Sequence, residues 1–201
     1  MPRFLLSLAF ALGMIGLSVV PGAAQGQAKA VFAGGCFWCT EADFDKVPGV
    51  LATTSGYIGG KASDATYNLV SAGRTDHVEA VEVTYNPAVV SYQKLLDIYW
   101  RTIDPTVKDR QFCDVGPHYR SAIYVRNDEE RRLAEASKQK VAAQLKTTIY
   151  TQINASGPFY KAEEYHQDYY KKNATKYKFY RWNCGRDQRL EQIWGAAKGD
   201  S

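Results

Sequence analysis

The sequence predicts an α+β domain in which a mostly antiparallel sheet carries helices on its face. The segment VEAVEVTY, residues 78–85, alternates apolar and polar side chains as a half-buried strand does. In residues 91–102, Leu95 and Tyr99 recur at helical spacing behind Ser91, which is a suitable N-cap residue. Strands and helices follow one another in irregular order, and not in the strict alternation that is typical of a parallel α/β sheet.

Short apolar runs, ended by glycine, proline or capping residues, predict the other elements. Strands are expected at residues 30–33, 51–57, 121–126 and 148–154. Helices are expected from Cys36 or Phe37 to the residue before Pro48, from Asn127 or Asp128 to Leu145, over 159–172, and over a short last segment with Leu190, Ile193 and Trp194.

Two segments are predicted to be irregular. Residues 104–118 contain two prolines and a cysteine, and a loop of this length inside a compact domain is usually functional. From Asn173 onward the chain is expected to be loop-like around Cys184 and Gly185.

The composition indicates one globular domain without a nucleic-acid partner. The chain has 201 residues, of which 45% are hydrophobic and 23% are charged, which is enough for one sizeable core. Its formal net charge is only +4, and basic residues are interleaved with acidic ones. No run of lysine and arginine is long enough to suggest a nucleic-acid groove.

The N-terminal segment predicts a secretory signal peptide over residues 1–28. Arg3 precedes an apolar run over 4–20, and small residues then offer cleavage after Ala24 or Ala28. The apolar run is short for a membrane span, although an uncleaved anchor is the alternative. No other segment is long and apolar enough to cross a bilayer. We therefore expect an exported protein, periplasmic or secreted, whose mature domain is not inserted in the membrane.

The stretch GGCFWCTEADF, residues 34–44, predicts a reactive cysteine. A strand that ends in two glycines and opens into a helix places Cys36 at the helix N-terminus. Free backbone N–H groups and the positive end of the helix dipole stabilise an anion there, so a lowered pKa is expected for this thiol. Phe37 and Trp38 add an apolar wall beside the sulfur. Such a site suits a substrate with an apolar end and one polar atom.

Four cysteines, Cys36, Cys39, Cys113 and Cys184, leave other interpretations open. An even number in an exported protein suggests two structural disulfides. A CxxC pair at a helix start is also typical of thioredoxin-like thiol–disulfide exchange. A zinc-stabilised binding module is less favoured, because no second CxxC or HxxxH pair exists to complete a metal site. We therefore expect no bound metal.

Several motifs occur in a fixed order along residues 30–180. They are GGCFWC at 34–39, KVPGV at 46–50, SGYIGG at 55–60, TYNLVSAGRTDHVEAVEVTYNP at 66–87, SYQKLLDIYW at 91–100, DVGPHYRSAIY at 114–124 and the region around Phe159, Glu163 and His166. In this set the chain resembles the peptide methionine sulfoxide reductases of the A type.

The resemblance implies a fold and an activity. The fold is a two-layer α/β sandwich of ferredoxin-like type. The activity is thiol-dependent reduction of methionine S-sulfoxide, free and in proteins, through a cysteine sulfenic acid and then an intramolecular disulfide. A thioredoxin-like protein is the implied electron donor, and neither a metal nor an organic cofactor is implied. Because exported compartments are oxidising, the reductant of this chain is expected to receive its electrons from a membrane protein.

The resemblance also assigns roles by position. Cys36 matches the nucleophile, Glu79 the acid that protonates the sulfoxide oxygen, Tyr67 and Tyr119 the phenols that hydrogen-bond this oxygen, Phe37 and Trp38 the pocket for the substrate methyl group, and Asp114 a polar pocket residue. A carboxyl group that donates a proton must be neutral beforehand, so we expect Glu79 to be buried with a raised pKa. Glu82 should point to the other face of the strand, and His118 and His166 are expected to be structural.

The disulfide partner of Cys36 is left between three candidates. The family commonly keeps its resolving cysteine in a mobile C-terminal segment, which favours Cys184 as the first resolver and as part of a C-terminal tail of the catalytic domain, residues 29–201. Cys39 is the next candidate, at a position where many relatives have glycine. Cys113 adjoins Asp114 and is the third.

Overall fold

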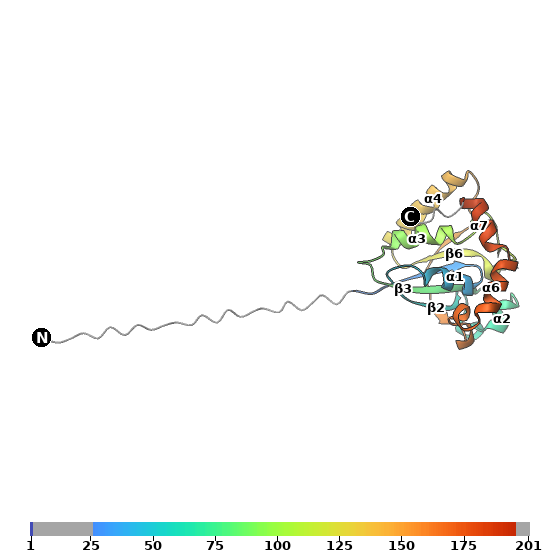
Figure 1. Cartoon of the computed structure of the whole chain (residues 1–201), viewed down its shortest axis with the longest axis horizontal. Helices are drawn as coiled ribbons and strands as arrows, with labels where there is room; N and C mark the ends of the chain where they lie inside the picture. The colour runs from blue at the N-terminus through green and yellow to red at the C-terminus, as the bar shows by residue number, and fades with distance from the viewer. Residues whose placement is uncertain (2–25, 196–201) are drawn as a thin grey trace.

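The structure, a computed structural model, describes Met1 and residues 26–195. Within this part of the chain six strands form the main sheet: β1 (Ala28–Gly34), β2 (Val50–Ile58), β3 (Val78–Tyr85), β6 (Ser121–Val125), β7 (Gln152–Ala155) and β8 (Phe159–Lys161). Their order is β7-β6-β1-β3-β2-β8, and all neighbours are antiparallel except β6 and β7. The prediction of an α+β fold with a mostly antiparallel sheet is confirmed (Figure 1).

The sheet is strongly curled, as the short connection between its two edge strands shows. Only residues 156–158 join β7 to β8. Five steps of about 4.8 Å would place the edges of a flat six-stranded sheet about 24 Å apart. The connection from β7 to β8 reaches only about 14 Å when fully extended. The connection lies over the sheet face that carries the small buried side chains of Ala33, Ala80 and Ala122, and Phe159 packs against this cluster. Small side chains leave the room that the curl requires.

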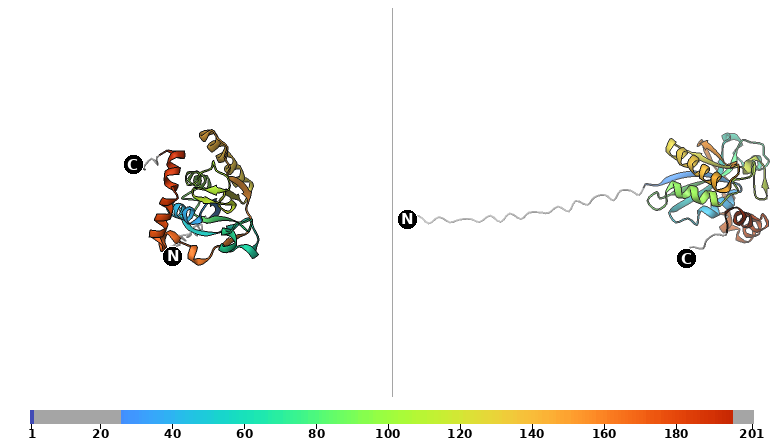
Figure 2. Two further views of the ribbon diagram at one scale, coloured as in Figure 1. Left: turned by 90° about the vertical axis from the view of Figure 1, so that its right-hand side faces the viewer. Right: turned by 90° about the horizontal axis from the view of Figure 1, so that it is seen from above.

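Helices cover the other face of the sheet and one side of the domain. The described helices are α1 (Phe37–Phe44), α2 (Tyr67–Ser71), α3 (Tyr92–Arg101), α4 (Asp128–Leu145), α5 (Tyr169–Lys172), α6 (Ala174–Asn183) and α7 (Arg186–Trp194). The main core lies between the sheet and α1, α3 and α4, and in it Phe32 stacks on Phe44 and Tyr99 with ring centroids 5.0 and 5.1 Å away. α6 and α7 follow each other along one side of the molecule (Figures 1 and 2). None of the described helices is long and apolar enough to span a membrane.

The elements with strong local signals form where the sequence predicts them. The alternating segment 78–85 is β3. Ser91 caps α3 by accepting a hydrogen bond from the Lys94 N–H group at 3.1 Å, and Asn127 caps α4 in the same way from Glu130 at 2.8 Å.

Two predictions about the second half of the chain are wrong, and a third is correct only in part. Residues 159–172 are not one helix, because Phe159–Lys161 pairs with β2 as strand β8, and only the last residues form α5. The strand expected over 148–154 begins at Gln152. The segment after Asn173 is not a loop but the helix α6. The long loop 104–118 also contains a short hairpin, β4 (Arg110–Gln111) and β5 (Asp114–Val115).

Candidate active site

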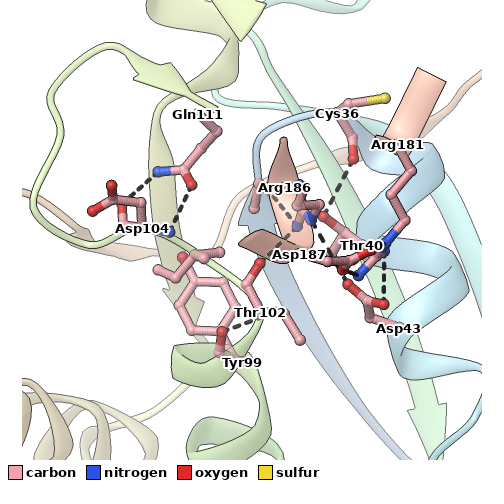
Figure 3. A network of polar contacts seen from close by, with 12 residues as sticks. Cys36, Thr40, Asp43, Tyr99, Thr102, Asp104, Gln111, Arg181, Arg186 and Asp187 are labelled. Carbon is pink, nitrogen blue, oxygen red and sulfur yellow. Dashed lines mark hydrogen bonds and ion pairs between the residues drawn. The ribbon is translucent and has the colours of Figure 1, made fainter. Parts of the chain in front are cut away.

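The turn between β1 and α1 presents Cys36. Gly35 has φ +82°, and a Cβ atom there would lie 2.5 Å from the Cβ atom of Gln111, so only glycine fits. Gln111 is itself fixed, because its side-chain amide bonds both the backbone N–H and the carbonyl of Asp104 (Figure 3). Cys36 is the N-cap residue of α1, and its carbonyl accepts from the Cys39 and Thr40 N–H groups at 3.1 and 3.3 Å. The predicted place of Cys36 at a helix start is confirmed.

The predicted lowering of the Cys36 pKa is wrong. Only 6% of this residue is exposed. Burial, a hydrogen bond with Cys39 and the negative charges of Glu79 and Asp114 raise the pKa of the Cys36 thiol well above its ordinary value. The sequence shows the helix N-terminus but does not show that two carboxyl groups from distant segments lie beside the thiol. In the resting site the Cys36 thiol is therefore protonated.

Glu79 lies next to this thiol on β3. It is 2% exposed, and its Oε2 atom accepts a hydrogen bond from the Phe37 N–H group at 3.0 Å. Burial raises the pKa of Glu79 to about 8, and the charge of Asp114 adds to this rise. Glu82, three residues further on, faces the other side of the sheet and pairs with Lys29 at 2.6 Å. Glu79 is thus a carboxylic acid that carries a proton at neutral pH.

Tyr67 and Tyr119 bring two phenols to the same place. Burial raises the pKa of both, and the negative charges of Glu79 and Cys36 raise it further. Among the described residues, neither phenol hydroxyl has a hydrogen-bond partner. Both hydroxyls are therefore available as neutral hydrogen-bond donors beside the thiol and the carboxyl group.

Phe37 and Trp38 lie in different surroundings. Phe37 is 1% exposed, and its ring packs against His166 and Tyr57 in the core, with centroids 4.9 and 5.9 Å away. It therefore supports the site from below, and its N–H group holds Glu79. Trp38 is partly exposed and stacks face to face on Tyr169 at 3.7 Å. Trp38 is thus the one of the two that presents part of an aromatic ring to the outside.

His166, which was expected to be structural, and Glu163 support these rings. The Trp38 indole N–H donates to His166 Nδ1 at 3.0 Å, and burial lowers the pKa of His166, so its ring is a neutral acceptor. Glu163 accepts from the Tyr57 hydroxyl at 2.8 Å and from the Tyr67 N–H group at 2.9 Å. Both contacts cross about 100 residues of sequence, so no local pattern shows them.

Asp114 connects the β4–β5 hairpin to α6. Its Oδ2 atom accepts a hydrogen bond from the Tyr180 hydroxyl, and burial raises its pKa. Its negative charge contributes to the raised pKa of Cys36 and of Glu79. Asp114 is thus near both groups, as a pocket residue should be.

Cys39 has the more acidic thiol of the CxxC pair. The hydrogen bond with Cys36 and the charges of Arg186 and Arg181 lower its pKa to about 7, although only 1% of Cys39 is exposed. The interaction between the two sulfurs raises the pKa of Cys36 and lowers that of Cys39. The structure thus places a proton-accepting sulfur directly beside the nucleophile.

Two arginines from the C-terminal helices converge behind Cys39, which the sequence did not indicate. Arg186 is 1% exposed, donates to the Thr102 carbonyl at 2.7 Å and lies over the Phe112 ring at 4.4 Å. Arg181 pairs with Asp43 of α1 at 2.9 Å, and Arg186 approaches the same carboxyl group at 3.9 Å (Figure 3). A buried cation of this kind anchors the segment after Cys184 to the nucleophile turn.

Cys184 is not in a mobile tail. It is the C-cap residue of α6 and is bonded to Cys113 in a disulfide, while Cys36 and Cys39 are free thiols. The structure therefore places Cys39, and not Cys184, against Cys36. In the described part of the chain, Cys113, Asp114 and Cys184 form the one group with the spacing of metal ligands. Because its two sulfurs are bonded to each other, this group does not fit a resident metal.

Glu41 on α1 gives a prediction about stability. Its Oε2 atom is buried without a hydrogen-bond partner, and burial raises its pKa from 4.5 to about 7. A carboxyl group whose pKa is higher in the folded state binds more protons when folded, so stability falls as the pH rises from about 4.5 to 7. Glu41→Gln removes this loss and is expected to gain roughly 3 kcal/mol in unfolding free energy over the unmodified protein between pH 4 and pH 8.

Urea unfolding of both proteins at the two pH values measures this gain. Glu135→Gln, at an exposed position on α4, is the matched control and should show no such gain. A difference between Glu41→Gln and the unmodified protein that is equal at both pH values would contradict the prediction.

The chain is similar in sequence and in structure to known proteins. Residues 28–198 match the family model of peptide methionine sulfoxide reductase. The chain belongs to the peptide methionine sulfoxide reductase family, A type. Peptide methionine sulfoxide reductase MsrA 2 of Caulobacter vibrioides is 49% identical over 97% of this chain and 100% of its own length.

A second relative and a solved structure agree with this membership. Peptide methionine sulfoxide reductase MsrA of Bacillus licheniformis is 49% identical over 86% of this chain and 96% of its own length. The structure of Mxr1 from Saccharomyces cerevisiae in reduced form has a TM-score of 0.71 and 32% identity, covering 76% of this chain and 88% of that one. The resemblance stated from the motifs is thus confirmed. As a methionine sulfoxide reductase, the protein reduces its substrate with cysteine thiols and forms a disulfide.

Proposed function

We propose that this reductase acts at Cys36 with Glu79 as the proton donor and with Tyr67 and Tyr119 as hydrogen-bond donors to the sulfoxide oxygen. The observation that carries this assignment is Glu79, a buried carboxyl group that is neutral at physiological pH beside a buried thiol. A sulfoxide oxygen leaves sulfur only after it gains a proton, and these groups supply one proton and two hydrogen bonds beside a buried thiol.

The protons and electrons of the proposed reaction balance within the site. The Cys36 proton passes to Cys39 along their hydrogen bond, and the Cys36 sulfur attacks the substrate sulfur while Glu79 protonates the oxygen. The hydroxyl group then passes from the substrate sulfur to the Cys36 sulfur as the bond between the two sulfurs breaks, so that methionine leaves and Cys36 becomes a sulfenic acid. Condensation with a second thiol then releases this oxygen as water, which contains the proton from Cys36 and the proton from Glu79. The two cysteines lose the two electrons that methionine sulfoxide gains.

The proposed substrate is the S epimer of methionine sulfoxide, free and in proteins, as family membership suggests. Trp38 offers one apolar surface, and the two phenols donate hydrogen bonds to the sulfoxide oxygen. This arrangement is chiral, so the site can distinguish the two epimers. The test is reduction of a racemic methionine sulfoxide by the pre-reduced protein, with the epimers resolved afterwards. Loss of the S epimer alone supports the proposal. Equal loss of both epimers, or loss of the R epimer, overturns the assigned geometry.

The proposed electron donor is a thioredoxin-like protein. Mxr1, to which this chain is 32% identical, has also been solved in complex with Trx2. Since the electrons come from cysteine thiols, the proposed cycle uses no metal or organic cofactor.

We also infer that the protein is exported and that its signal peptide is cleaved after Ala24. The basic start, the apolar run and the small residues support a signal peptide. Ala28 pairs with Tyr85 as the first residue of β1, so cleavage behind it would shorten the strand, whereas cleavage behind Ala24 leaves the strand whole.

The strand order supports a ferredoxin-like core. β1, β2, β3 and β6, with α1 after β1 and α3 after β3, give the order β6-β1-β3-β2 with antiparallel neighbours. This is the order of a βαββαβ unit, to which β7 and β8 add one strand at each edge.

A further inference from the structure

The four cysteines form two pairs that differ in accessibility. Cys36 and Cys39 form an inner pair in which both residues are buried. Cys113 and Cys184 form an outer pair, a disulfide in which Cys113 is exposed and Cys184 is partly exposed. Thiol–disulfide exchange requires direct attack on a sulfur atom. A protein reductant can therefore reach the outer disulfide far more readily than an inner one.

The outer pair lies next to the inner pair through two bridging residues. Asp114 follows Cys113 directly, and its charge acts on Cys36. Asp114 accepts the hydrogen bond from Tyr180, which is one helical turn before Cys184 and packs edge-on against Trp38 at 5.8 Å. Trp38 stands between the two cysteines of the inner pair in sequence. The two pairs are thus separated by about one layer of side chains.

Cys184 is also connected to Cys39 from its other side. Arg186, two residues after Cys184, is one of the charges that lower the pKa of Cys39. Between them Gly185 has φ +63° and forms the junction of α6 and α7. Because Cys184 lies at this junction and not inside a helix, its thiol can change partner through a local rearrangement of the turn.

We propose that Cys113 takes part in the catalytic cycle, and that the outer pair accepts the oxidising equivalents of the inner pair and passes them to the reductant. This inference rests on the proposed function and adds a residue to it. The chain carries a single cysteine in its C-terminal segment, and the structure supplies the partner for it from the β4–β5 hairpin, 71 residues away in sequence.

Each step of this relay is a two-electron exchange. Cys39 condenses with the Cys36 sulfenic acid, and water leaves with the Cys36–Cys39 disulfide formed. The Cys184 thiolate attacks the Cys39 sulfur, so that a Cys39–Cys184 bond forms and Cys36 leaves as a thiolate. The Cys113 thiolate then attacks the Cys184 sulfur, which forms Cys113–Cys184 and releases the Cys39 thiolate. A thioredoxin-like dithiol reduces this last disulfide and is itself oxidised.

A purely structural disulfide is the competing explanation, and the contacts around Cys184 argue against it. The segment is already held by Arg186 on the Thr102 carbonyl, by Arg181 on Asp43 and by Arg189 on Asp104 at 2.7 Å. A covalent bond is not needed to keep α6 and α7 in place.

The test counts turnovers in the absence of reductant. The full mature protein, pre-reduced with a thioredoxin-like dithiol and freed of it, is mixed with excess methionine sulfoxide. The relay predicts about two equivalents of methionine and the loss of about four thiols. The inner pair transfers its first disulfide to the outer pair and can then reduce a second equivalent of substrate. Cys184→Ser cannot attack the inner disulfide and should stop after about one equivalent, whereas Cys113→Ser cannot complete the relay and should end with a Cys39–Cys184 bond and a sulfenic acid on Cys36 that a dione reagent traps. Val115→Ala, at an exposed position of the same hairpin, is the matched control and should give about two.

Three further readouts keep the outcomes distinct. With one equivalent of substrate, peptide mapping should find Cys113–Cys184 and not Cys36–Cys39. The ratio of thioredoxin-supported to dithiothreitol-supported turnover should fall at least about tenfold in Cys113→Ser, since the small dithiol reaches inner sulfurs. Thermal unfolding checks that this variant is folded, and Cys113→Ala replaces it if not.

The results that would overturn the relay differ from those that would overturn the proposed function. One equivalent from the unmodified protein, the absence of a Cys39–Cys184 bond in Cys113→Ser, or a Cys113–Cys184 bond that the thioredoxin-like dithiol leaves intact would each remove Cys113 from the cycle. No methionine at all from the unmodified, fully reduced protein would instead contradict the proposed function itself.

Discussion

Cys36→Ser is expected to abolish the reduction of methionine sulfoxide, with a fall of at least about 10⁴-fold in the rate of the first turnover. A serine hydroxyl is a far weaker nucleophile than a thiol at neutral pH and forms no stable bond that corresponds to the sulfenic acid. The serine side chain fits the space of the cysteine, and the backbone carbonyl that caps α1 is unchanged. The measurement is single-turnover methionine formation by the pre-reduced variant, with circular dichroism as the check on folding.

This prediction distinguishes the two thiols of the CxxC pair, because acidity favours Cys39 as the nucleophile and position favours Cys36. Cys39 has the lower pKa, about 7, whereas the pKa of Cys36 is raised. However, Glu79 and Asp114 are among the groups that raise the pKa of Cys36, and the charge of Cys36 acts on both Tyr67 and Tyr119. Position decides, because the sulfur that receives the oxygen must lie beside the groups that protonate it.

Cys39→Ser is the matched substitution, one helical turn away. It leaves the nucleophile in place, so the first equivalent of substrate should still be reduced, and a sulfenic acid on Cys36 should be trapped by a dione reagent. The opposite result, with activity retained in Cys36→Ser and lost in Cys39→Ser, would make Cys39 the nucleophile.

The parts of the fold and site that follow from local sequence could be predicted. The alternation in β3, the caps at Ser91 and Asn127, and the glycine turn before Cys36 each depend on neighbouring residues only. Glu79 was assigned through the motif that surrounds it, and its burial and raised pKa agree with that assignment.

The parts that could not be predicted depend on contacts across the chain. β8 exists because it pairs with β2, and residues 159–161 carry no strand signal strong enough to show it alone. α6 packs Tyr177 on Cys39, and its mixed polar and aromatic composition hides its one buried side chain. The Cys113–Cys184 bond joins two segments that neither spacing nor motif connects. The pKa of Cys36 is raised, and not lowered as predicted, for the same reason: the carboxyl groups of Glu79 and Asp114 come from distant segments of the chain.

The reductase step should lose activity as the pH rises through about 8, because Glu79 must be protonated to donate. Its pKa is raised from 4.5 to about 8 in the folded protein, so it carries its proton at neutral pH and loses it above that value. The rate of the first turnover should therefore be highest between about pH 7 and pH 8, fall below about pH 7 as Cys39 becomes protonated and can no longer accept the Cys36 proton, and fall about tenfold for each further unit above about pH 8. Stopped-flow measurement of the first turnover isolates this step from disulfide reduction.

Glu79→Gln tests whether this carboxyl group is the origin of the pH dependence. The amide oxygen can still accept the Phe37 N–H bond, so the site keeps its shape while it loses the acid. The rate at pH 7 is expected to fall about 10²- to 10³-fold, and the decline above pH 8 should disappear. The variant should also lose less stability than the unmodified protein as the pH rises from about 5 to 9, since a buried carboxyl group with a raised pKa destabilises the fold when it ionises. A variant with an unchanged rate and an unchanged decline would show that the proton comes from another group, and Tyr67 or Tyr119 would then be the next candidates.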